Sequence, residues 1–250
     1  MEELRGKAAV ITGASRGIGA AAAREFGRLG VSVVLAARSG EAIGRIAAEI
    51  RAAGGAAEAV ACDVARYGDV AAAVARCREA FGRLDIMVNN AGMIEPIGPL
   101  AESDPEVWAA AFSVNALGVY HGLRAAIPLM ETGGVVVNVS SGAAVNALEG
   151  WSQYCAGKAA ALMLTRAAQK EHGDRVRVVG LSPGTVATEM QRVIKASGVN
   201  PVSRLDWSDH IPPEWPARAI AWLSTEAASD IAGEDFSLRA EENRRRVGLI

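Results

Sequence analysis

The sequence has few of the residues that mark disulfide-bonded, metal-binding or nucleic-acid-binding proteins. Its three cysteines, Cys62, Cys77 and Cys155, are scattered without metal-site spacing, so we expect no metal ion. A sparse, odd set of cysteines is typical of a reducing cytoplasm. The formal net charge is only −2, which gives no basic surplus for nucleic acid and no acidic block that would favour disorder.

No segment has the composition of a secretory signal or a membrane span. The first seven residues are largely charged or polar and run straight into an apolar strand, without the apolar core and cleavage site of a signal peptide. The longest uncharged runs, 107–123 and 132–148, are interrupted by polar residues and glycine. We therefore expect a cytoplasmic protein that binds neither membrane nor nucleic acid.

What the sequence does contain is an alternation of short β-branched runs with longer alanine-rich stretches. Half of the residues are hydrophobic, which is enough for a large core in a chain of 250 residues. The predicted strands are 7–12, 31–37, 57–62, 85–89, 134–140, 176–181 and 234–238, and the predicted helices are 17–29, 41–53, 67–81, 105–130, 151–172 and 213–225. Continuous apolar strands alternating with helices predict an α/β fold: one Rossmann-type, doubly wound domain over residues 1–250, with a seven-stranded parallel sheet between two helical layers.

One segment departs from this alternation. Residues 185–213 contain Gly198, Pro201, Pro212 and Pro213 among mixed polar and apolar residues. Connections of this length in compact domains are often lids over a site, so we interpret the segment as a substrate lid. The alternative is an ordinary surface excursion.

A glycine-rich turn lies between the first predicted strand and the first predicted helix. Residues 12–19 read Thr-Gly-Ala-Ser-Arg-Gly-Ile-Gly. Gly13 would allow a tight turn, Gly17 a close approach of backbone to a pyrophosphate, and Gly19 close packing of the helix on the sheet. The helix start would present N–H groups to phosphates. The turn therefore predicts a dinucleotide site, although such spacings also occur in flexible loops.

The end of the second predicted strand indicates which dinucleotide binds. NAD sites commonly place an acidic residue about 20 residues after the turn, to bind the ribose 2′-hydroxyl. Here the strand ends in Ala37, followed by Arg38 and Ser39, without a carboxylate. Arg38, with Arg16 in the turn, could pair with a 2′-phosphate, which predicts NADP(H) over NAD(H). The alternative is that Arg38 is a solvated residue that leads into a helix.

Tyr154 and Lys158 lie four residues apart near the start of a predicted helix. This spacing puts the phenol and the ammonium on one helix face. A tyrosine with a pKa of about 10 is a poor acid or base at neutral pH, and a nearby cation lowers that pKa. The pair is a candidate for general acid/base chemistry.

Together these motifs resemble those of the short-chain dehydrogenase/reductase family. The turn at 12–19 matches the family's TGxxxGxG pattern, and residues 89–92 match its NNAG segment. Ser141 lies 13 residues before Tyr154, where the family has its serine, and Asn115 falls in the helix that carries its asparagine. Pro183 and Gly184 with Thr188 match a further segment. The resemblance extends over almost the whole chain and implies a soluble oxidoreductase.

The resemblance assigns roles to four catalytic residues. Tyr154 would exchange a proton with the substrate oxygen, and Lys158 would bind the nicotinamide ribose and lower the Tyr154 pKa. Ser141 would orient and polarise the substrate oxygen, while Asn115 would hold a water that links Lys158 to solvent. The cofactor would supply the hydride chemistry.

The glycine turn, the strand ends and the resemblance together give the expected cofactor contacts. Asp63 and Val64 would flank the adenine, Asn89 and Ala91 would line a ribose, and Thr188 would hold the carboxamide. The full expected set is Gly13, Ser15, Arg16, Gly17, Ile18, Gly19, Arg38, Ser39, Asp63, Val64, Asn89, Ala91, Gly92, Tyr154, Lys158, Pro183, Gly184, Val186 and Thr188.

Several of these residues have a simpler interpretation. Consecutive residues at a strand end point to opposite faces, so only Ser140 or Ser141 can face the site, and the spacing to Tyr154 favours Ser141. Asn115 could instead bond to neighbouring backbone in a buried helix. Asp63 could be only a turn residue, and Asn89 with Asn90 could serve backbone bonding at the sheet end.

The sequence also departs from the family pattern. Gly157 replaces the usual serine, and the usual C-terminal glycine turn is missing. The charged run at 241–246 is interpreted as a solvated tail. The Gly150–Trp151 segment before Tyr154 resembles the sepiapterin and benzil reductase neighbourhood, which acts on vicinal dicarbonyls. Trp151 would line a pocket for an apolar substrate or would belong to the core.

These observations predict an NADPH-dependent carbonyl reductase for ketones or aldehydes, including diketones. One alternative is an NAD(P)-dependent alcohol or sugar dehydrogenase, and the substrate in either case is a small carbonyl or alcohol compound. A second alternative is a non-catalytic protein that senses a dinucleotide, since one fold hosts many functions. The resemblance also implies a homodimer or homotetramer formed through the helices at 105–130 and 151–172.

Overall fold

The strands form one parallel sheet in the order β3-β2-β1-β4-β5-β6-β7. A computed structural model describes every residue from Met1 to Ile250. The strands are β1 (Ala8–Thr12), β2 (Ser32–Ala37), β3 (Ala57–Ala61), β4 (Ile86–Asn89), β5 (Gly134–Val139), β6 (Val176–Ser182) and β7 (Asp235–Ser237). All six neighbouring pairs are parallel. The predicted doubly wound fold is confirmed, and each predicted strand end lies within one residue of the observed one.

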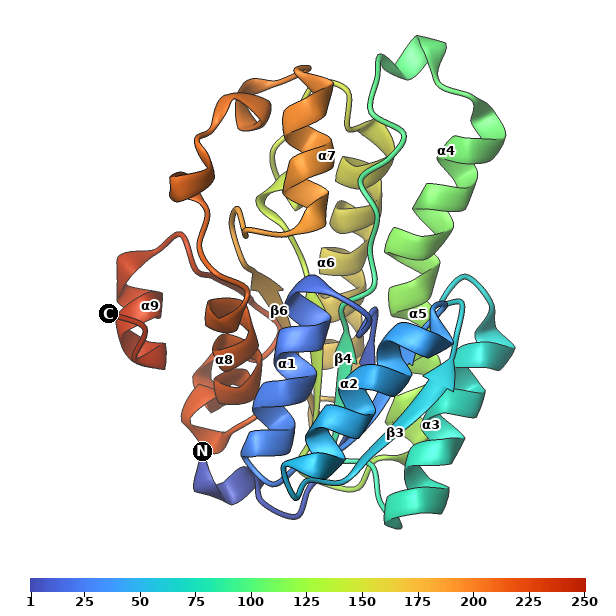
Figure 1. Ribbon diagram of the computed structural model, residues 1–250, viewed down its shortest axis with the longest axis vertical. Helices are drawn as coiled ribbons and strands as arrows, with labels where there is room; N and C mark the ends of the chain where they lie inside the picture. Colours follow the sequence, from blue (N-terminus) through green and yellow to red (C-terminus); the bar gives the residue numbers. More distant parts are fainter.

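Helices cover both faces of the sheet (Figure 1). They are α1 (Gly17–Arg28), α2 (Gly40–Ala52), α3 (Tyr67–Phe81), α4 (Pro105–Phe112), α5 (Gly118–Ala126), α6 (Ser152–His172), α7 (Glu189–Ser197), α8 (Glu214–Leu223) and α9 (Glu241–Val247). One apolar core packs α1, α2 and α8 against the sheet, and a second packs α3, α5 and α6 against its other face. Burial on both faces explains why the strands are continuous apolar runs. None of the helices is both long and apolar enough to cross a lipid bilayer.

The long helix predicted at 105–130 is interrupted. A π-helical turn at Ser113–Leu117 separates α4 from α5, and a 3₁₀ turn at Ile127–Leu129 follows α5. Pro128 has no N–H for a helical hydrogen bond, which accounts for the change near the end. The π turn carries Asn115, and such turns are often found at functional sites.

The segment at 185–213 is more ordered than the sequence suggested. It contains α7 and two 3₁₀ turns, and Val186 pairs with Ile211 across its base. Asn200 caps one of these turns by accepting from the Val202 N–H at 3.0 Å and donates to the Glu149 carbonyl at 3.0 Å. In Figure 1, α7 stands at the end of the molecule that also holds the start of α6.

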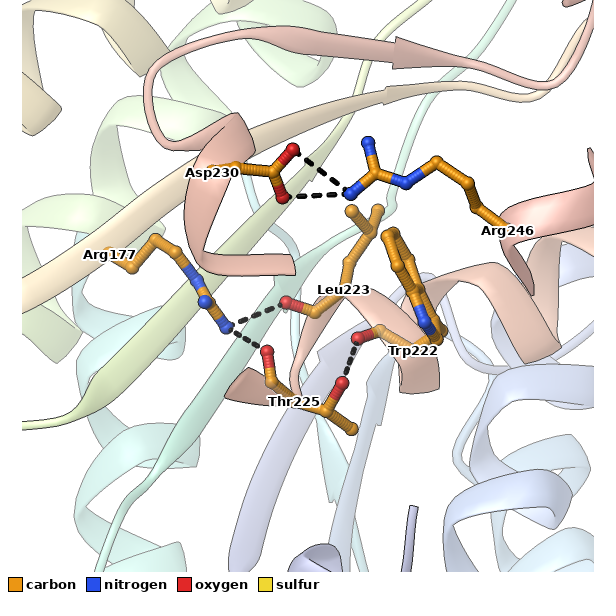
Figure 2. Close-up of polar contacts among 6 residues, drawn as sticks. All are labelled: Arg177, Trp222, Leu223, Thr225, Asp230 and Arg246. Atoms are coloured by element: carbon orange, nitrogen blue, oxygen red, sulfur yellow. Dashed lines mark hydrogen bonds and ion pairs between the residues drawn. The ribbon is translucent and has the colours of Figure 1, made fainter. Parts of the chain in front are cut away.

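The expected solvated tail is instead a helix that packs on the core. Val247 of α9 is buried, and the Arg246 guanidinium lies 5.0 Å from the ring centre of Trp222. The same guanidinium pairs with Asp230 at 2.8 Å (Figure 2). Beside this cluster, Arg177 at the start of β6 donates to the carbonyls of Leu223 and Thr225, which ties the sheet to the end of α8.

The strand order places a crevice at the carboxyl ends of β1 and β4. The chain winds from β1 toward β3 on one side and from β4 toward β7 on the other. In open α/β sheets, ligands bind at this point of reversal. The segments after β1, β4, β5 and β6, which carry most of the expected site residues, all emerge at this edge.

Candidate active site

The glycine turn after β1 has no room for side chains. Gly13 and Gly17 have positive φ angles of 64° and 53°, which favour glycine. A Cβ on Gly13 would lie 2.7 Å from Ala91 Cα, and a Cβ on Gly19 would lie 2.4 Å from the Gly13 carbonyl oxygen. Both distances are shorter than van der Waals contact. The turn therefore packs directly against the segment after β4, as the motif predicts.

The hydroxyl of Thr12 joins these two segments. It donates to the Val88 carbonyl at 3.3 Å and accepts from the N–H groups of Asn90 and Ala91 at 3.0 and 3.2 Å. The Asn90 amide donates in return to the carbonyls of Thr12 and Gly13 at 2.9 and 3.2 Å. Asn90 thus serves the backbone bonding that its position at the sheet end suggested.

The side chain of Asn89 faces away from the crevice. It lies under α5, where its Nδ2 donates to Asn138 Oδ1 at 2.8 Å. A Cβ on Gly122 of α5 would fall 1.8 Å from Asn89 Oδ1, so the absence of a side chain at Gly122 makes room for this amide. A contact between Asn89 and a bound nucleotide would therefore involve the Asn89 backbone.

Two unpaired guanidinium groups flank the turn. Arg38 follows β2 and Arg16 precedes α1; both side chains are exposed, and neither forms an ion pair. Ser39 caps α2 by accepting from the Ala42 N–H at 3.4 Å. Free cations beside a glycine turn, with no carboxylate at the end of β2, suit a dinucleotide that carries a 2′-phosphate.

The expected adenine side of the crevice shows mainly structural bonds. Asp63 accepts from the Ala65 N–H at 3.0 Å, as a turn residue does. Val64 is buried, and its carbonyl accepts from Nδ1 of His121 at 2.7 Å, which places the histidine proton on that nitrogen.

The loop after β6 closes over the glycine turn. A Cβ on Gly17 would lie 3.2 Å from Thr188 Cγ2, so Thr188 sits against the turn. Gly184 has a φ of 76°, and the Thr188 hydroxyl donates to the Val186 carbonyl at 3.2 Å. A cavity of about 620 Å³ borders Ser15 and Thr188 on the outer side of α1, away from Tyr154 and Lys158.

Three side chains meet at the carboxyl end of β5. Tyr154 and Lys158 lie one turn apart on α6, with the Lys158 Nζ 5.6 Å from the phenol ring centre. Ser141 lies two residues after β5, where its hydroxyl interacts with the Tyr154 phenol and accepts from the Ala143 N–H at 3.1 Å. Lys158 Nζ donates to the Val139 carbonyl at 2.6 Å. The predicted phenol, ammonium and hydroxyl are therefore brought together.

The pKa of Tyr154 is shifted opposite to the expected direction. Burial raises it above the usual value, and the hydrogen bond with Ser141 only partly offsets this increase. The phenol lies among Ile94, Ala143, Trp151 and Ile194, an apolar environment that disfavours phenolate. Near neutral pH, Tyr154 holds its proton and is poised to act as an acid.

Burial lowers the pKa of Lys158 to about 8, because loss of solvent disfavours the charged ammonium. The side chain is almost fully enclosed, and the charge of Asp235 partly counteracts the loss of solvent. The ammonium is therefore present at neutral pH and is lost at moderately alkaline pH.

The side-chain amide of Asn115 forms hydrogen bonds to Met93 and Gln153. Its Oδ1 accepts from the Met93 N–H at 3.0 Å, and its Nδ2 donates to the Met93 carbonyl at 2.8 Å and to Gln153 Oε1 at 3.1 Å. Asn115 is therefore a buried residue that bonds to neighbouring backbone, as its simpler interpretation predicted. Asn115 also remains close to the site: a Cβ on Gly92 would lie 3.2 Å from its Oδ1 and 3.6 Å from Lys158 Nζ.

Gln153 is a site residue that the sequence analysis missed. It is buried, accepts from Asn115, and donates to the Ile94 carbonyl at 2.6 Å. The sequence contained a signal for Gln153. It lies four residues before Gly157, so both residues lie on the same face of α6 and face the same neighbouring element. That neighbour is the π turn with Asn115.

Gly157 permits this contact, so we expect Gly157→Ser to destabilise the protein. A Cβ at this position would lie 2.6 Å from Asn115 Cβ. Overpacking costs about 1–3 kcal/mol, which outweighs the roughly 0.5 kcal/mol gained in helix propensity. Urea unfolding should show a lower free energy of unfolding. As a matched control, Gly44→Ala in α2 has open space and should stabilise by up to about 1 kcal/mol. Equal stability of Gly157→Ser and wild type would contradict the close contact.

Comparison with known proteins identifies the family. A family model described as short chain dehydrogenase matches residues 7–197. The chain is 37% identical over 243 residues to 3beta-hydroxysteroid dehydrogenase 1 of Eggerthella lenta, covering 93% of this chain and 92% of that protein. It is 35% identical over 238 residues to meso-2,3-butanediol dehydrogenase of Serratia marcescens, covering 92% of each.

A solved structure is also closely similar. It is a short chain dehydrogenase from Burkholderia cenocepacia in complex with NADP, with a TM-score of 0.83, 30% sequence identity, and coverage of 94% of this chain and 96% of that one. With the glycine turn, the buried Tyr154–Lys158 pair and the strand order in agreement, the chain belongs to the short-chain dehydrogenase/reductase family.

Proposed function

We propose that the protein is an NADPH-dependent carbonyl reductase for small apolar ketones and aldehydes, including vicinal diketones. This proposal rests on one observation: the side chains of Ser141, Tyr154 and Lys158 lie together at the end of β5, and the phenol lies inside an apolar cluster. A protonated phenol in such surroundings can give a proton to a carbonyl oxygen as hydride arrives at the carbon.

Each residue then has a defined task. Bound NADPH supplies the hydride. The Ser141 hydroxyl donates a hydrogen bond to the substrate oxygen, and Tyr154 transfers its proton to that oxygen. Lys158 stabilises the negative charge that develops on the phenol, since it lies one helical turn away. A water beside Gly92 would reach both Asn115 and Lys158 and would return the proton from solvent.

The preference for NADPH rests on charge. Arg16 and Arg38 lie at the edge of the crevice without partners, and the doubly charged 2′-phosphate of NADPH would pair with them. The structural relative from Burkholderia cenocepacia was solved with NADP, which agrees with this preference. The expected contacts at Ile18, Val64, Pro183 and Thr188 belong to the same proposal.

The lining of the site favours an apolar substrate with two neighbouring oxygens. Side chains from α7 complete the apolar cluster around Tyr154, so the segment at 185–213 would act as the lid. Trp151 packs edge-on against Tyr154 with ring centres 5.7 Å apart, and its Nε1–H is buried without a partner. A buried unpaired donor costs free energy. An oxygen next to the reacting carbonyl would satisfy it, and one relative is named for a vicinal diol.

A matched pair of substrates tests this proposal. We expect NADPH-dependent reduction of 1-phenyl-1,2-propanedione to exceed that of propiophenone, which has the same skeleton with one carbonyl. Trp151→Phe removes the indole N–H together with part of the ring, so kcat/KM should fall by roughly 10-fold more for the diketone than for the monoketone. Trp207→Phe, at the exposed surface of the lid segment, is the control. Equal losses on both substrates would exclude recognition of a second oxygen.

The rate of reduction should fall at alkaline pH. Lys158 has a pKa of about 8, so its ammonium is present below pH 8 and is lost above it. Because kcat/KM reports ionisations of the free enzyme, kcat/KM for NADPH should fall above about pH 8. Stopped-assay rates from pH 6 to 10 check this. A flat profile through pH 9 would show that Lys158 keeps its proton.

The names of two relatives favour the reverse reaction as a second candidate. Oxidation of an alcohol would use the same groups, with Tyr154 accepting the proton. The raised pKa of Tyr154 places that reaction at higher pH than reduction. Rates of NADP⁺ reduction and NADPH oxidation on one alcohol–ketone pair across pH would separate the two directions.

We also infer association of copies through α4, α5 and α6. Large apolar side chains are exposed on these helices: Val107, Tyr120 and Met163. Burial of such a patch favours a homodimer or homotetramer. Light scattering at micromolar concentration gives the number of copies.

A further inference from the structure

A row of polar residues crosses the sheet beneath the site. The register aligns Asn89 of β4 with Asn138 of β5, Asn138 with Gly180 of β6, and Gly180 with Asp235 of β7. All four point to the face covered by α5 and α6, because Met87, Val136 and Val178, two residues earlier, belong to that core. Asn89 donates to Asn138, and Asn138 donates to the Thr165 hydroxyl of α6, but Asp235 takes no part in this network.

The structure makes room for the Asp235 carboxylate. A Cβ on Gly180 would lie 2.8 Å from Asp235 Oδ1, so the absence of a side chain on β6 accommodates this oxygen. Oδ2 accepts from the Ser182 hydroxyl at 2.6 Å. Oδ1 is buried without a hydrogen-bond partner of good geometry, as is the Ser140 hydroxyl. A buried carboxylate with unused hydrogen-bonding capacity is costly unless a nearby cation compensates it.

Lys158 is the buried cation on the same side of the sheet. Its Nζ bonds to the carbonyl of Val139, and the next residue, Ser140, lies toward Asp235. Burial raises the pKa of the Asp235 carboxyl, and the hydroxyls of Ser182 and Ser140 partly offset this rise. The only other cation that acts on this carboxylate is Arg166, an exposed residue of α6. Lys158 and Asp235 form their hydrogen bonds with other groups and not with each other. Their charges attract over a longer distance, because the buried protein between them has a low dielectric constant.

We propose that Asp235 is a positioning residue whose buried carboxylate, accommodated by Gly180, is the counter-charge that keeps Lys158 protonated. The two groups lie on different elements, β7 and α6, on the same side of the sheet and near the strand end that carries Ser140. Asp235 touches neither substrate nor cofactor in this proposal. It acts by holding the ammonium in its charged form through neutral pH. The consequence for catalysis rests on the proposed reductase function, whereas the charge of Lys158 can be measured without it.

The charge state can be read directly, because the chain contains only four lysines: Lys7, Lys158, Lys170 and Lys195. Protein labelled with ¹³C-lysine and free of cofactor gives one Cε signal for each, and Lys158→Arg assigns the signal of interest. In wild type, the Lys158 signal should titrate near pH 8. In Asp235→Asn, which keeps the shape of the side chain, the titration should move to lower pH by roughly one unit.

Two further variants keep the test decisive. Asp235→Thr also removes the charge and suits a strand, so it replaces Asp235→Asn if that variant does not fold. Asp230→Asn removes an exposed carboxylate from the same region of the chain and should leave the Lys158 titration unchanged. An unshifted Lys158 titration in both neutral variants of Asp235 would overturn the proposal and leave Asp235 a purely structural residue.

Enzyme kinetics supply the second readout. The alkaline fall in kcat/KM for NADPH should move to lower pH in Asp235→Asn by the same amount as the NMR titration, with little change in the rate at pH 6. A loss of rate at every pH with an unshifted profile would contradict the proposal. Absence of NADPH-dependent activity in wild type would refute the reductase function, while the NMR titration would still decide the role of Asp235.

Discussion

Tyr154→Phe is expected to lower kcat for NADPH-dependent ketone reduction by roughly 100- to 10,000-fold. The substitution removes one oxygen and keeps the ring, so packing against Trp151 is retained. No other acid lies in the apolar cluster around this position to protonate the product oxygen. A positioned general acid commonly contributes a factor of this size. Initial rates of NADPH oxidation with a saturating diketone measure the change.

The control for this variant is Tyr120→Phe. Tyr120 is exposed on α5, and loss of its hydroxyl should leave the rate unchanged. Binding of NADPH, followed by its fluorescence, should be similar in wild type and Tyr154→Phe. Wild-type rates in Tyr154→Phe would remove the phenol from the chemistry. Binding without turnover in any variant or wild type would favour the alternative of a dinucleotide sensor.

Reversal of charge at Arg38 is expected to reverse the cofactor preference. Arg38→Asp replaces an unpaired guanidinium at the end of β2 with a carboxylate, which repels a 2′-phosphate and can accept from a ribose 2′-hydroxyl. A charge-assisted hydrogen bond contributes about 1.5–3 kcal/mol. The ratio of kcat/KM for NADPH to that for NADH should therefore fall by roughly 10- to 100-fold or more.

Arg45→Asp controls for a general effect of charge. Arg45 is an exposed residue of α2 that pairs with Glu41, one turn further along the helix from the crevice. It should change the NADPH-to-NADH ratio by much less than Arg38→Asp. Equal use of both cofactors by wild type, or an unchanged ratio in Arg38→Asp, would show that Arg38 does not contact the phosphate.

The parts of the fold with a local cause were predictable from the sequence. Most strands are short apolar runs rich in valine, isoleucine or alanine and are followed by a polar residue, a glycine or a charge, and all seven were located within one residue. The close packing of the glycine turn also has a local cause, because Gly13 and Gly19 have no room for a Cβ, and this backbone requirement is visible in the sequence. The spacing of Tyr154 and Lys158 likewise depends only on helix geometry.

The parts that depend on distant partners were not predictable. The charged run at 241–246 folds as α9 because Arg246 finds Trp222 and Asp230, whose proximity requires the complete fold. The pKa of Tyr154 was expected to fall beside Lys158, but the enclosing apolar side chains from α7 raise it. α7 itself had a signal in the helical spacing of Met190, Val193 and Ile194, which the surrounding prolines and glycine obscured.

The orientation of Asn89 is an intermediate case. Alternation along β4 puts Asn89 on the same face as Met87, toward α5, and this follows from strand geometry alone. The glycine in α5 that accommodates the amide could not be assigned without the packed structure.

Transfer of deuterium from NADPH that carries deuterium at both C4 positions of the nicotinamide tests the proposed chemistry most directly. With 1-phenyl-1,2-propanedione as substrate, mass spectrometry should find one deuterium on the carbinol carbon of the product for each NADPH oxidised, and almost none with Tyr154→Phe. Product without deuterium, or NADPH bound and not oxidised with any carbonyl compound tested, would contradict hydride transfer at this site.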